Sequence, residues 1–157
     1  MIVHSHALTA PVDPATVWRH WVDVDQWPDH FPGLKTAKLN GPVAVGAVGL
    51  VKPNRGGRWS FRIAQVDRSK KRFAIERKLL LTTLRFSFAL DRPEDIEGAD
   101  TDEPPLPAAP DVWTATYRVE LKGALAAIYE RTAARPIARQ LERLAASVAE
   151  ASPPEAD

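Results

Sequence analysis

The sequence predicts an α+β domain in which a curved antiparallel sheet of about seven strands wraps around one long C-terminal helix. Two short helices are expected between the first and second strands. Short segments of alternating apolar and polar residues follow one another with turn residues between them, which is typical of antiparallel hairpins. Residues 123–150 instead carry apolar residues at steps of three and four, which is typical of a helix with one apolar face. A sheet folded around that helix would bury all the apolar faces together.

The composition is that of one globular domain. The chain has 157 residues, of which 45% are hydrophobic and 26% charged, enough for a substantial core. No run of apolar residues is long enough to span a membrane, and no signal peptide is visible, so a cytoplasmic location is the default expectation. The absence of cysteine excludes disulfides, zinc–thiolate sites and thiol catalysis.

The charge is unevenly distributed along the chain. Seven acidic residues and one base lie between Arg92 and Asp111, so the rest of the chain is basic although the net charge is only +1. A basic body can attract nucleic acid or an anionic lipid surface. The bases are scattered without a dense cluster, so we expect a solvated arginine-rich surface and no nucleic-acid partner.

The N-terminal segment predicts a strand followed by two short helices. The strand covers Ile2–Thr9. Asp13 has the character of a helix N-cap with Pro14 at the first helical position, and this helix should end near Asp23. A second short helical turn is expected over Asp25–Phe31, before a Pro-Gly pair.

Six further strands are predicted from apolar alternation bounded by turn residues. They cover residues 34–39, 47–52, 58–66, 72–80, 82–90 and 112–121. Between the last two, residues 92–111 are acidic and rich in proline, so we expect a long mobile loop. The single domain should cover residues 1–151, and residues 152–157 should form a disordered tail. Within the final helix, Pro136 should cause a kink because proline removes a backbone hydrogen bond.

Short signatures spread over nearly the whole chain carry a resemblance to a known family. They lie at residues 8–11, 13–18, 23–27, 31–33, 46–49 and 123–125. In these segments the chain resembles the START/Bet v 1-like (SRPBCC) superfamily, and within it the polyketide cyclase/dehydrase and lipid transport group. The resemblance implies a helix-grip fold with an apolar ligand held between the sheet and the long helix. It leaves function open, because members include cyclases or aromatases, hormone or lipid carriers, and proteins that act through partners.

No set of residues points to catalysis, a metal or a cofactor. The Gly-x-Ser-x-Gly pattern is absent, and no carboxylate pair stands out. His4 and His6 would share one strand face, but no third metal ligand can be identified. Gly56-Gly57 is a turn, because no phosphate-loop pattern or helix follows it. We therefore assign no catalytic or metal-binding residues and lean against an enzyme.

The aromatic residues are the positive signal for function. Most of them fall on the face predicted to be inward, where they either fill a core or line a cavity for an apolar ligand. The candidate cavity-lining residues are Trp59, Phe61, Phe73, Arg77, Phe86, Phe88, Trp113, Tyr117, Leu125 and Tyr129. We expect the first half of the final helix, residues 123–134, to face this cavity, and residues 137–148 to seal the core.

Gln65 and Arg77 break the inward apolar pattern. A buried arginine without a partner is costly, so Arg77 either reaches solvent at the end of the sheet or anchors a polar group of a ligand. Tyr117 could supply a hydroxyl beside it. The leading hypothesis is thus binding of a small hydrophobic ligand, lipid or polyketide-like, between sheet and helix. The alternatives are a polyketide cyclase or aromatase and a protein-interaction module without a ligand; the oligomeric state is not predicted.

Overall fold

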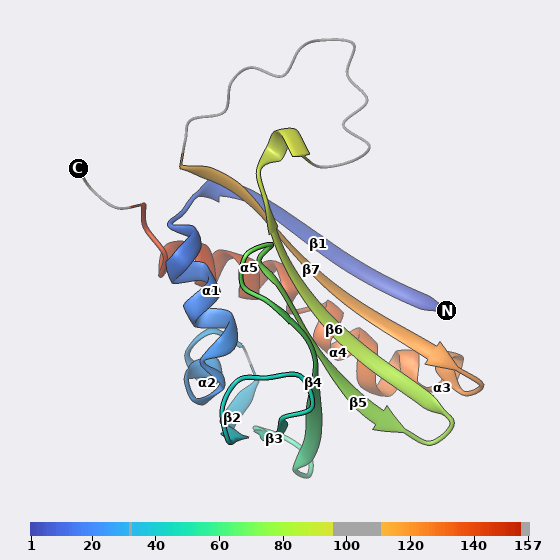
Figure 1. Ribbon diagram of the computed structural model, residues 1–157. Coiled ribbons are helices and arrows are strands. Elements are labelled where there is room, and N and C mark those ends of the chain that lie inside the picture. Colours follow the sequence, from blue (N-terminus) through green and yellow to red (C-terminus); the bar gives the residue numbers. More distant parts are fainter. Residues whose placement is uncertain (32, 96–110, 155–157) are drawn as a thin grey trace, which may run out of the picture.

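A computed structural model describes residues 1–31, 33–95 and 111–154. It contains one antiparallel sheet in the order β1-β7-β6-β5-β4-β3-β2, with the C-terminal helix crossing one face (Figure 1). The strands are β1 (Ile2–Pro11), β2 (Leu34–Asn40), β3 (Val48–Pro53), β4 (Trp59–Asp67), β5 (Arg72–Leu79), β6 (Thr82–Asp91) and β7 (Val112–Gly123). The predicted fold class is confirmed, and every predicted strand is present with ends displaced by at most two residues.

The two short helices follow β1 as predicted. α1 (Pro14–Val22) begins directly after Asp13, whose carboxylate accepts a hydrogen bond from the Thr16 hydroxyl. A 3-10 turn, η1 (Val24–Gln26), leads into α2 (Trp27–His30). Both α1 and α2 contact the end of the C-terminal helix, so this helix is held from the side as well as by the sheet.

The C-terminal helix is interrupted in two places. It consists of α3 (Ala126–Tyr129), the π-helical turn η3 (Glu130–Ala134), α4 (Arg135–Ala138) and α5 (Leu141–Glu150). The wide π turn ends two residues before Pro136. Because proline has no backbone N–H, the regular helical hydrogen bonding is already interrupted at this point. The predicted single kink is therefore a π-helical turn, followed by a second break at residues 139–140.

The region predicted as an acidic loop lies largely outside the described residues. Of it the structure describes Arg92, a 3-10 turn, η2 (Pro93–Asp95), and Asp111. At the C-terminus, Ser152, expected to open the disordered tail, is fully buried. Its carbonyl accepts the backbone N–H of Asp13 at 3.0 Å, which ties the end of α5 to the start of α1.

A solid aromatic core fills the part of the sheet beneath α1. Phe73, Phe88 and Tyr117 are register partners across β5, β6 and β7 and are almost fully buried. Trp18 packs edge-on against Phe73, and Trp21 contacts Phe88 and Tyr117. The indole Nε1–H of Trp21 donates to the Tyr117 hydroxyl at 3.3 Å. This half of the concave face is closed to any ligand.

A bulge explains one of the two residues that break the apolar pattern. The register of β4 against β5 shifts between Ile63 and Gln65. The extra residue turns Gln65 outward, where it is exposed and accepts a hydrogen bond from Arg85 at 3.3 Å. A sequence pattern with a period of two residues does not reveal a bulge, so the prediction that Gln65 points inward was wrong.

Two histidines join the short helices to the C-terminal helix. His30 Nε2 lies 3.2 Å from His20 Nδ1, and His30 Nδ1 lies 3.2 Å from the Ser147 hydroxyl. His20 Nε2 is 3.1 Å from the carbonyl oxygen of Ala151. All three contacts are satisfied when both rings are neutral, because each ring then donates once and accepts once. The pair is half-buried and structural.

Candidate ligand-binding site

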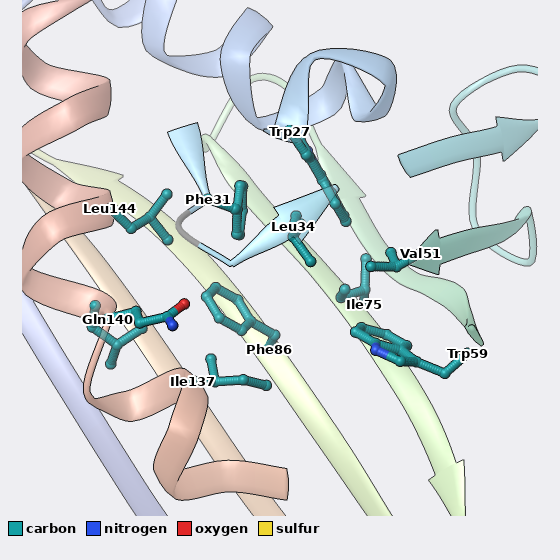
Figure 2. A pocket seen from close by; sticks show the side chains of 11 residues that line it. Trp27, Phe31, Leu34, Val51, Trp59, Ile75, Phe86, Ile137, Gln140 and Leu144 are labelled. Atoms are coloured by element: carbon teal, nitrogen blue, oxygen red, sulfur yellow. The ribbon is translucent and has the colours of Figure 1, made fainter. Parts of the chain in front are cut away.

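An apolar inner cavity of about 70 Å³ lies between the sheet and the second half of the C-terminal helix (Figure 2). It is lined by Trp27, Phe31, Leu34, Val51, Trp59, Ile75, Phe86, Ile137, Gln140, Leu141 and Leu144. Strands β2 to β6 supply one wall, α2 and the residue after it a second, and α4 and α5 the third. Gln140 is the one lining residue with a polar amide, so the cavity suits a flat or aliphatic group.

The inner cavity adjoins a larger, open vestibule of about 640 Å³. Its wall is formed by the β3–β4 loop and by the helix on either side of Pro136: Gly33, Leu34, Pro53, Asn54, Arg55, Gly56, Gly57, Trp59, Arg77, Thr132, Ala133, Pro136, Ile137 and Gln140. Leu34, Trp59, Ile137 and Gln140 line both spaces and therefore form the constriction between them. The vestibule falls in the usual range of ligand sites, roughly 300–1,000 Å³, whereas the enclosed part does not.

Arg77 presents an uncompensated cation to the vestibule. It lies on β5, two residues from Ile75 of the inner cavity, so its side chain starts from the same concave face. Its guanidinium lies over the Trp59 ring, 4.8 Å from the centroid. Among the described residues it has no ion pair or hydrogen bond. Burial lowers the pKa of Arg77 and the nearby Tyr129 opposes this, but an arginine stays charged at neutral pH.

Gln140 provides a second polar group at the constriction. It lies in the break between α4 and α5, and its amide covers Gly33, where an added Cβ would come within 3.3 Å of Nε2. Gly33 also has a φ of 87°, a backbone conformation that residues with a side chain rarely adopt. In the part of the chain that the structure describes, the Gln140 amide has no hydrogen-bond partner. A ligand that passes the constriction would therefore meet an amide free to bond.

Four of the predicted lining residues surround this site. Trp59 and Phe86 line the inner cavity, and Trp59 and Arg77 line the vestibule. Tyr129 lies near enough to Arg77 to favour its charged form. These residues come from β4, β5, β6 and α3, so the sheet and the helix both contribute to the site.

The other predicted residues are placed elsewhere. Phe61 is 2% exposed and stacks on Trp27 behind the cavity wall, at a centroid distance of 5.2 Å. Phe73, Phe88 and Tyr117 belong to the aromatic core beneath α1. Two more lie away from both spaces: Trp113 beneath the Arg92 guanidinium at 5.0 Å, and Leu125 directly before α3.

The structure does not bring Tyr117 and Arg77 together. Tyr117 pairs with Phe88 in the sheet, whereas Arg77 pairs with Leu84, four residues away along β6. Burial raises the pKa of the Tyr117 phenol far above its usual range, and its hydroxyl already accepts the Trp21 bond. Its role is structural, and the phenol nearer to Arg77 belongs to Tyr129.

The roles predicted for the two halves of the C-terminal helix are also corrected. The second half of the helix supplies Ile137, Gln140, Leu141 and Leu144 to the inner cavity, and the first half reaches only the vestibule, through residues 132–133. Trp27 and Phe31 line the inner cavity beside this part of the helix, and the sequence pattern gave no sign that they would. Alternating hydrophobicity could not identify these two, because they lie in and after a four-residue helix.

One of the two histidines on β1 contacts a carboxylate. His4 Nε2 lies 3.3 Å from Oε1 of Glu130, and the other carboxylate oxygen of Glu130 accepts from Arg135 at 2.8 Å. Within residues 1–31, 33–95 and 111–154, no three histidine, aspartate or glutamate side chains are grouped to hold an ion. In the same ranges no helix has the length and apolar character needed to cross a membrane.

Comparison with known proteins establishes the fold. No family model and no curated protein matches the sequence. Among solved structures, the chain is similar to the di-domain aromatase/cyclase BexL of the BE-7585A biosynthetic pathway, with 12% identity and a TM-score of 0.67, over 94% of this chain and 46% of BexL. It thus spans about half of the BexL chain.

Two further similarities cover nearly whole chains. Norcoclaurine synthase from Thalictrum flavum, in complex with dopamine and hydroxybenzaldehyde, has 13% identity and a TM-score of 0.66, over 95% of this chain and 84% of the synthase. Ara h 8.0201 has 15% identity and a TM-score of 0.60, over 94% and 98%. The chain therefore has the Bet v 1-like helix-grip fold that its sequence signatures indicate. At these identities the similarity extends to the fold alone.

Proposed function

We propose that this protein binds a small, mostly apolar ligand between the sheet and the C-terminal helix, with the polar end of the ligand toward Arg77. The single observation that carries the proposal is that the two spaces share lining residues. An apolar cavity adjoins, at Trp59 and Gln140, a vestibule whose Arg77 has no ion pair or hydrogen bond among the described residues. The apolar end of a ligand would lie against Phe86 and Leu144.

The charge of Arg77 defines the class of ligand further. A cation held over an indole face, with no ion-pair partner among the described residues, favours an anionic or strongly accepting group. The Gln140 amide can donate to or accept from a second polar atom at the constriction. We therefore expect a ligand with one apolar moiety and one carboxylate, phosphate, sulfonate or polarised carbonyl.

Support also comes from the use of this fold in solved structures. Norcoclaurine synthase binds dopamine and hydroxybenzaldehyde, which are small aromatic molecules with polar substituents. A ligand of that size would occupy the inner cavity and part of the vestibule here.

The test has two parts. Native mass spectrometry of the protein as purified should show a co-purified small molecule. Titration with two fluorescent probes should then separate the contributions: 8-anilinonaphthalene-1-sulfonate is anionic, and N-phenyl-1-naphthylamine is its neutral analogue. Arg77→Met should weaken binding of the anionic probe by roughly tenfold, the loss of one charge-assisted bond, and leave the neutral probe almost unchanged.

A matched control comes from the same sheet. Arg62→Met removes an arginine from the outer face of β4, where the residue is exposed, and should change neither affinity. Equal affinity of Arg77→Met and the unaltered protein for the anionic probe would contradict the role of Arg77. Failure of both probes and an empty mass spectrum would contradict the binding function itself.

A cyclase or aromatase is the second candidate function. The observation in its favour is the similarity to BexL, an aromatase/cyclase, together with a cation in the vestibule that Tyr129, outside the vestibule lining, lies close enough to influence. In such a reaction Arg77 would stabilise an enolate and Tyr129 would transfer a proton. Incubation with a linear poly-β-ketone and analysis of cyclised products would test it, and Tyr129→Phe should then abolish product formation without loss of binding. A protein-interaction module without ligand is the third candidate, supported if no small molecule binds.

A further inference from the structure

Large apolar side chains are exposed at one end of the sheet. The turn between β5 and β6 consists of Leu80 and Leu81, which are 69% and 68% exposed. Ile128 of α3 is 62% exposed, and Met1, before β1, is 76% exposed. We call these four residues the apolar tip.

The sheet register brings the members of the apolar tip to the same end. Thr82, directly after the turn, pairs with Gly123 at the end of β7, and the carbonyl of Leu81 accepts the N–H of Ala124 at 3.0 Å. Ile2 pairs with Leu121, so β1 begins at this end as well. Figure 1 shows the N-terminus, the β5–β6 turn and α3 at this end of the molecule.

The turn holds Leu81 in a backbone conformation that is unfavourable for leucine. Leu81 has a φ of 52°, in the left-handed region where glycine or asparagine is favoured. Folding alone would therefore select a small or polar residue at this exposed place. A strained and exposed leucine indicates a role outside the folded domain.

Unpaired cations surround the apolar tip. Lys78 and Lys122 lie on the outer face, each opposite Thr83 in adjacent strand pairs, and both are exposed. Arg131 is exposed in the π-helical turn that follows α3. Within the described residues none of these three cations has an ion pair.

Two acidic residues on the same strands as these lysines are paired within the sheet. Glu76 binds Arg85 at 3.0 Å, and Glu120 binds Arg118 at 2.7 Å. Among the described residues, Lys78 and Lys122 are therefore uncompensated positive charges beside the apolar tip.

We propose that the apolar tip docks on the surface of a membrane that contains anionic lipids. The leucines would enter the boundary between headgroups and acyl chains, and the lysines would lie at the level of the lipid phosphates. A second copy of the chain is a poorer partner, because the like charges of two tips would face each other. Nucleic acid would leave the apolar residues exposed to water.

The vestibule opens at the same end of the sheet. Trp59, which lines the vestibule, is the first residue of β4. Arg62 on β4 pairs with Glu76 on β5, and because the two strands are antiparallel, the start of β4 lies beside the end of β5 that carries Lys78. A docked protein would hold the vestibule near the bilayer surface, where apolar molecules partition. The docking does not require the proposed ligand, so the two proposals can fail separately.

Co-sedimentation with lipid vesicles tests the proposal. The unaltered protein should bind vesicles of equal parts phosphatidylcholine and phosphatidylglycerol, and bind phosphatidylcholine vesicles at least tenfold more weakly. The double variant Leu80→Asn/Leu81→Asn should weaken binding to the anionic vesicles by at least roughly tenfold. Asparagine tolerates the left-handed conformation, so this variant should fold at least as well as the unaltered protein.

Two further variants complete the design. Lys78→Gln/Lys122→Gln should weaken binding roughly tenfold or more and reduce its dependence on salt. Val45→Asn is the matched control, because Val45 is 66% exposed in the loop at the other end of β3 and should not affect binding.

Three results would overturn the proposal. The first is no binding of the unaltered protein to either kind of vesicle. The second is equal binding by the leucine double variant and the unaltered protein. The third is a dimer in analytical ultracentrifugation that the leucine double variant dissolves while vesicle binding is absent, since the tip would then be an interface between copies. Probe affinity in the cavity, measured on the same variants, should not change.

Discussion

Leu144→Ala tests the packing around the inner cavity most directly. Leu144 lies on α5, is 2% exposed and lines the cavity opposite Phe86 (Figure 2). Truncation of a buried leucine removes its transfer free energy and adds the cost of the space left behind, for a total of about 3–5 kcal/mol. Because Leu144 already borders an unfilled space, it has fewer packing contacts to lose than a leucine surrounded on all sides, and we expect a loss near the lower end of this range, about 3 kcal/mol.

The loss is measurable by urea and thermal denaturation. For a domain of this size 1 kcal/mol shifts the melting temperature by roughly 2–4 °C, so Leu144→Ala should melt roughly 6–12 °C lower. The enlarged cavity should also bind a small apolar molecule. Saturating benzene should therefore raise the melting temperature of Leu144→Ala more than that of the unaltered protein.

A control separates cavity effects from the substitution itself. Leu50→Ala changes the same side chain on β3, where it is 46% exposed, and should cost less than about 1 kcal/mol. If Leu144→Ala also cost less than about 1 kcal/mol, or if benzene stabilised both proteins equally, the cavity would not be bounded by Leu144 as described.

Three other predictions concern the elements that frame the site. Tyr117→Phe removes the hydroxyl that accepts the Trp21 Nε1–H at 3.3 Å, so the buried indole loses its partner and the unfolding free energy should fall by about 1–2 kcal/mol in urea denaturation. Gly49→Ala would place a Cβ in collision with the ring of Phe61, which must move, so the same assay should show a loss of about 1–3 kcal/mol. Burial, and then the charge of a neighbouring histidine, lowers the pKa of His30 from 6.5. As the pH falls, His30 is therefore protonated in the unfolded chain before it is protonated in the folded protein, and the stability should fall below pH 6.5. Thermal melts above and below that pH should show a smaller fall for His30→Asn than for the unaltered protein.

Each of these has its own internal check. Phe61→Leu should relieve part of the Gly49→Ala loss in the double variant, because the clash involves the ring; strict additivity would contradict this account. Tyr117→Phe should leave the affinity for both fluorescent probes unchanged. A weaker affinity would mean that Tyr117 contributes to ligand binding after all. An unchanged pH dependence in His30→Asn would mean that other groups titrate with folding.

The strands and their inward faces could be predicted because they depend on local pattern. Alternation with a period of two places Phe73 and Phe88 on the concave side wherever the strand pairs, and the turn residues mark its ends. The start of α1 could similarly be predicted from the local sequence, since Pro14 occupies the first helical position directly after Asp13. Arg77 stood out for the same reason, as a charge on an otherwise apolar face.

The division between core and cavity was decided only by the tertiary structure. Phe86 and Phe88 are equivalent in the sequence pattern, yet Phe86 lines the cavity and Phe88 packs under Trp21 in the core. The difference arises because α1 covers one part of the concave face, while α2 and the broken C-terminal helix leave space over another. A cavity is the volume that several packed elements fail to fill, so no single segment of the sequence encodes it. The sequence by itself determined which side chains point inward, and the packing of helices on a curved sheet determined which of them a ligand could meet.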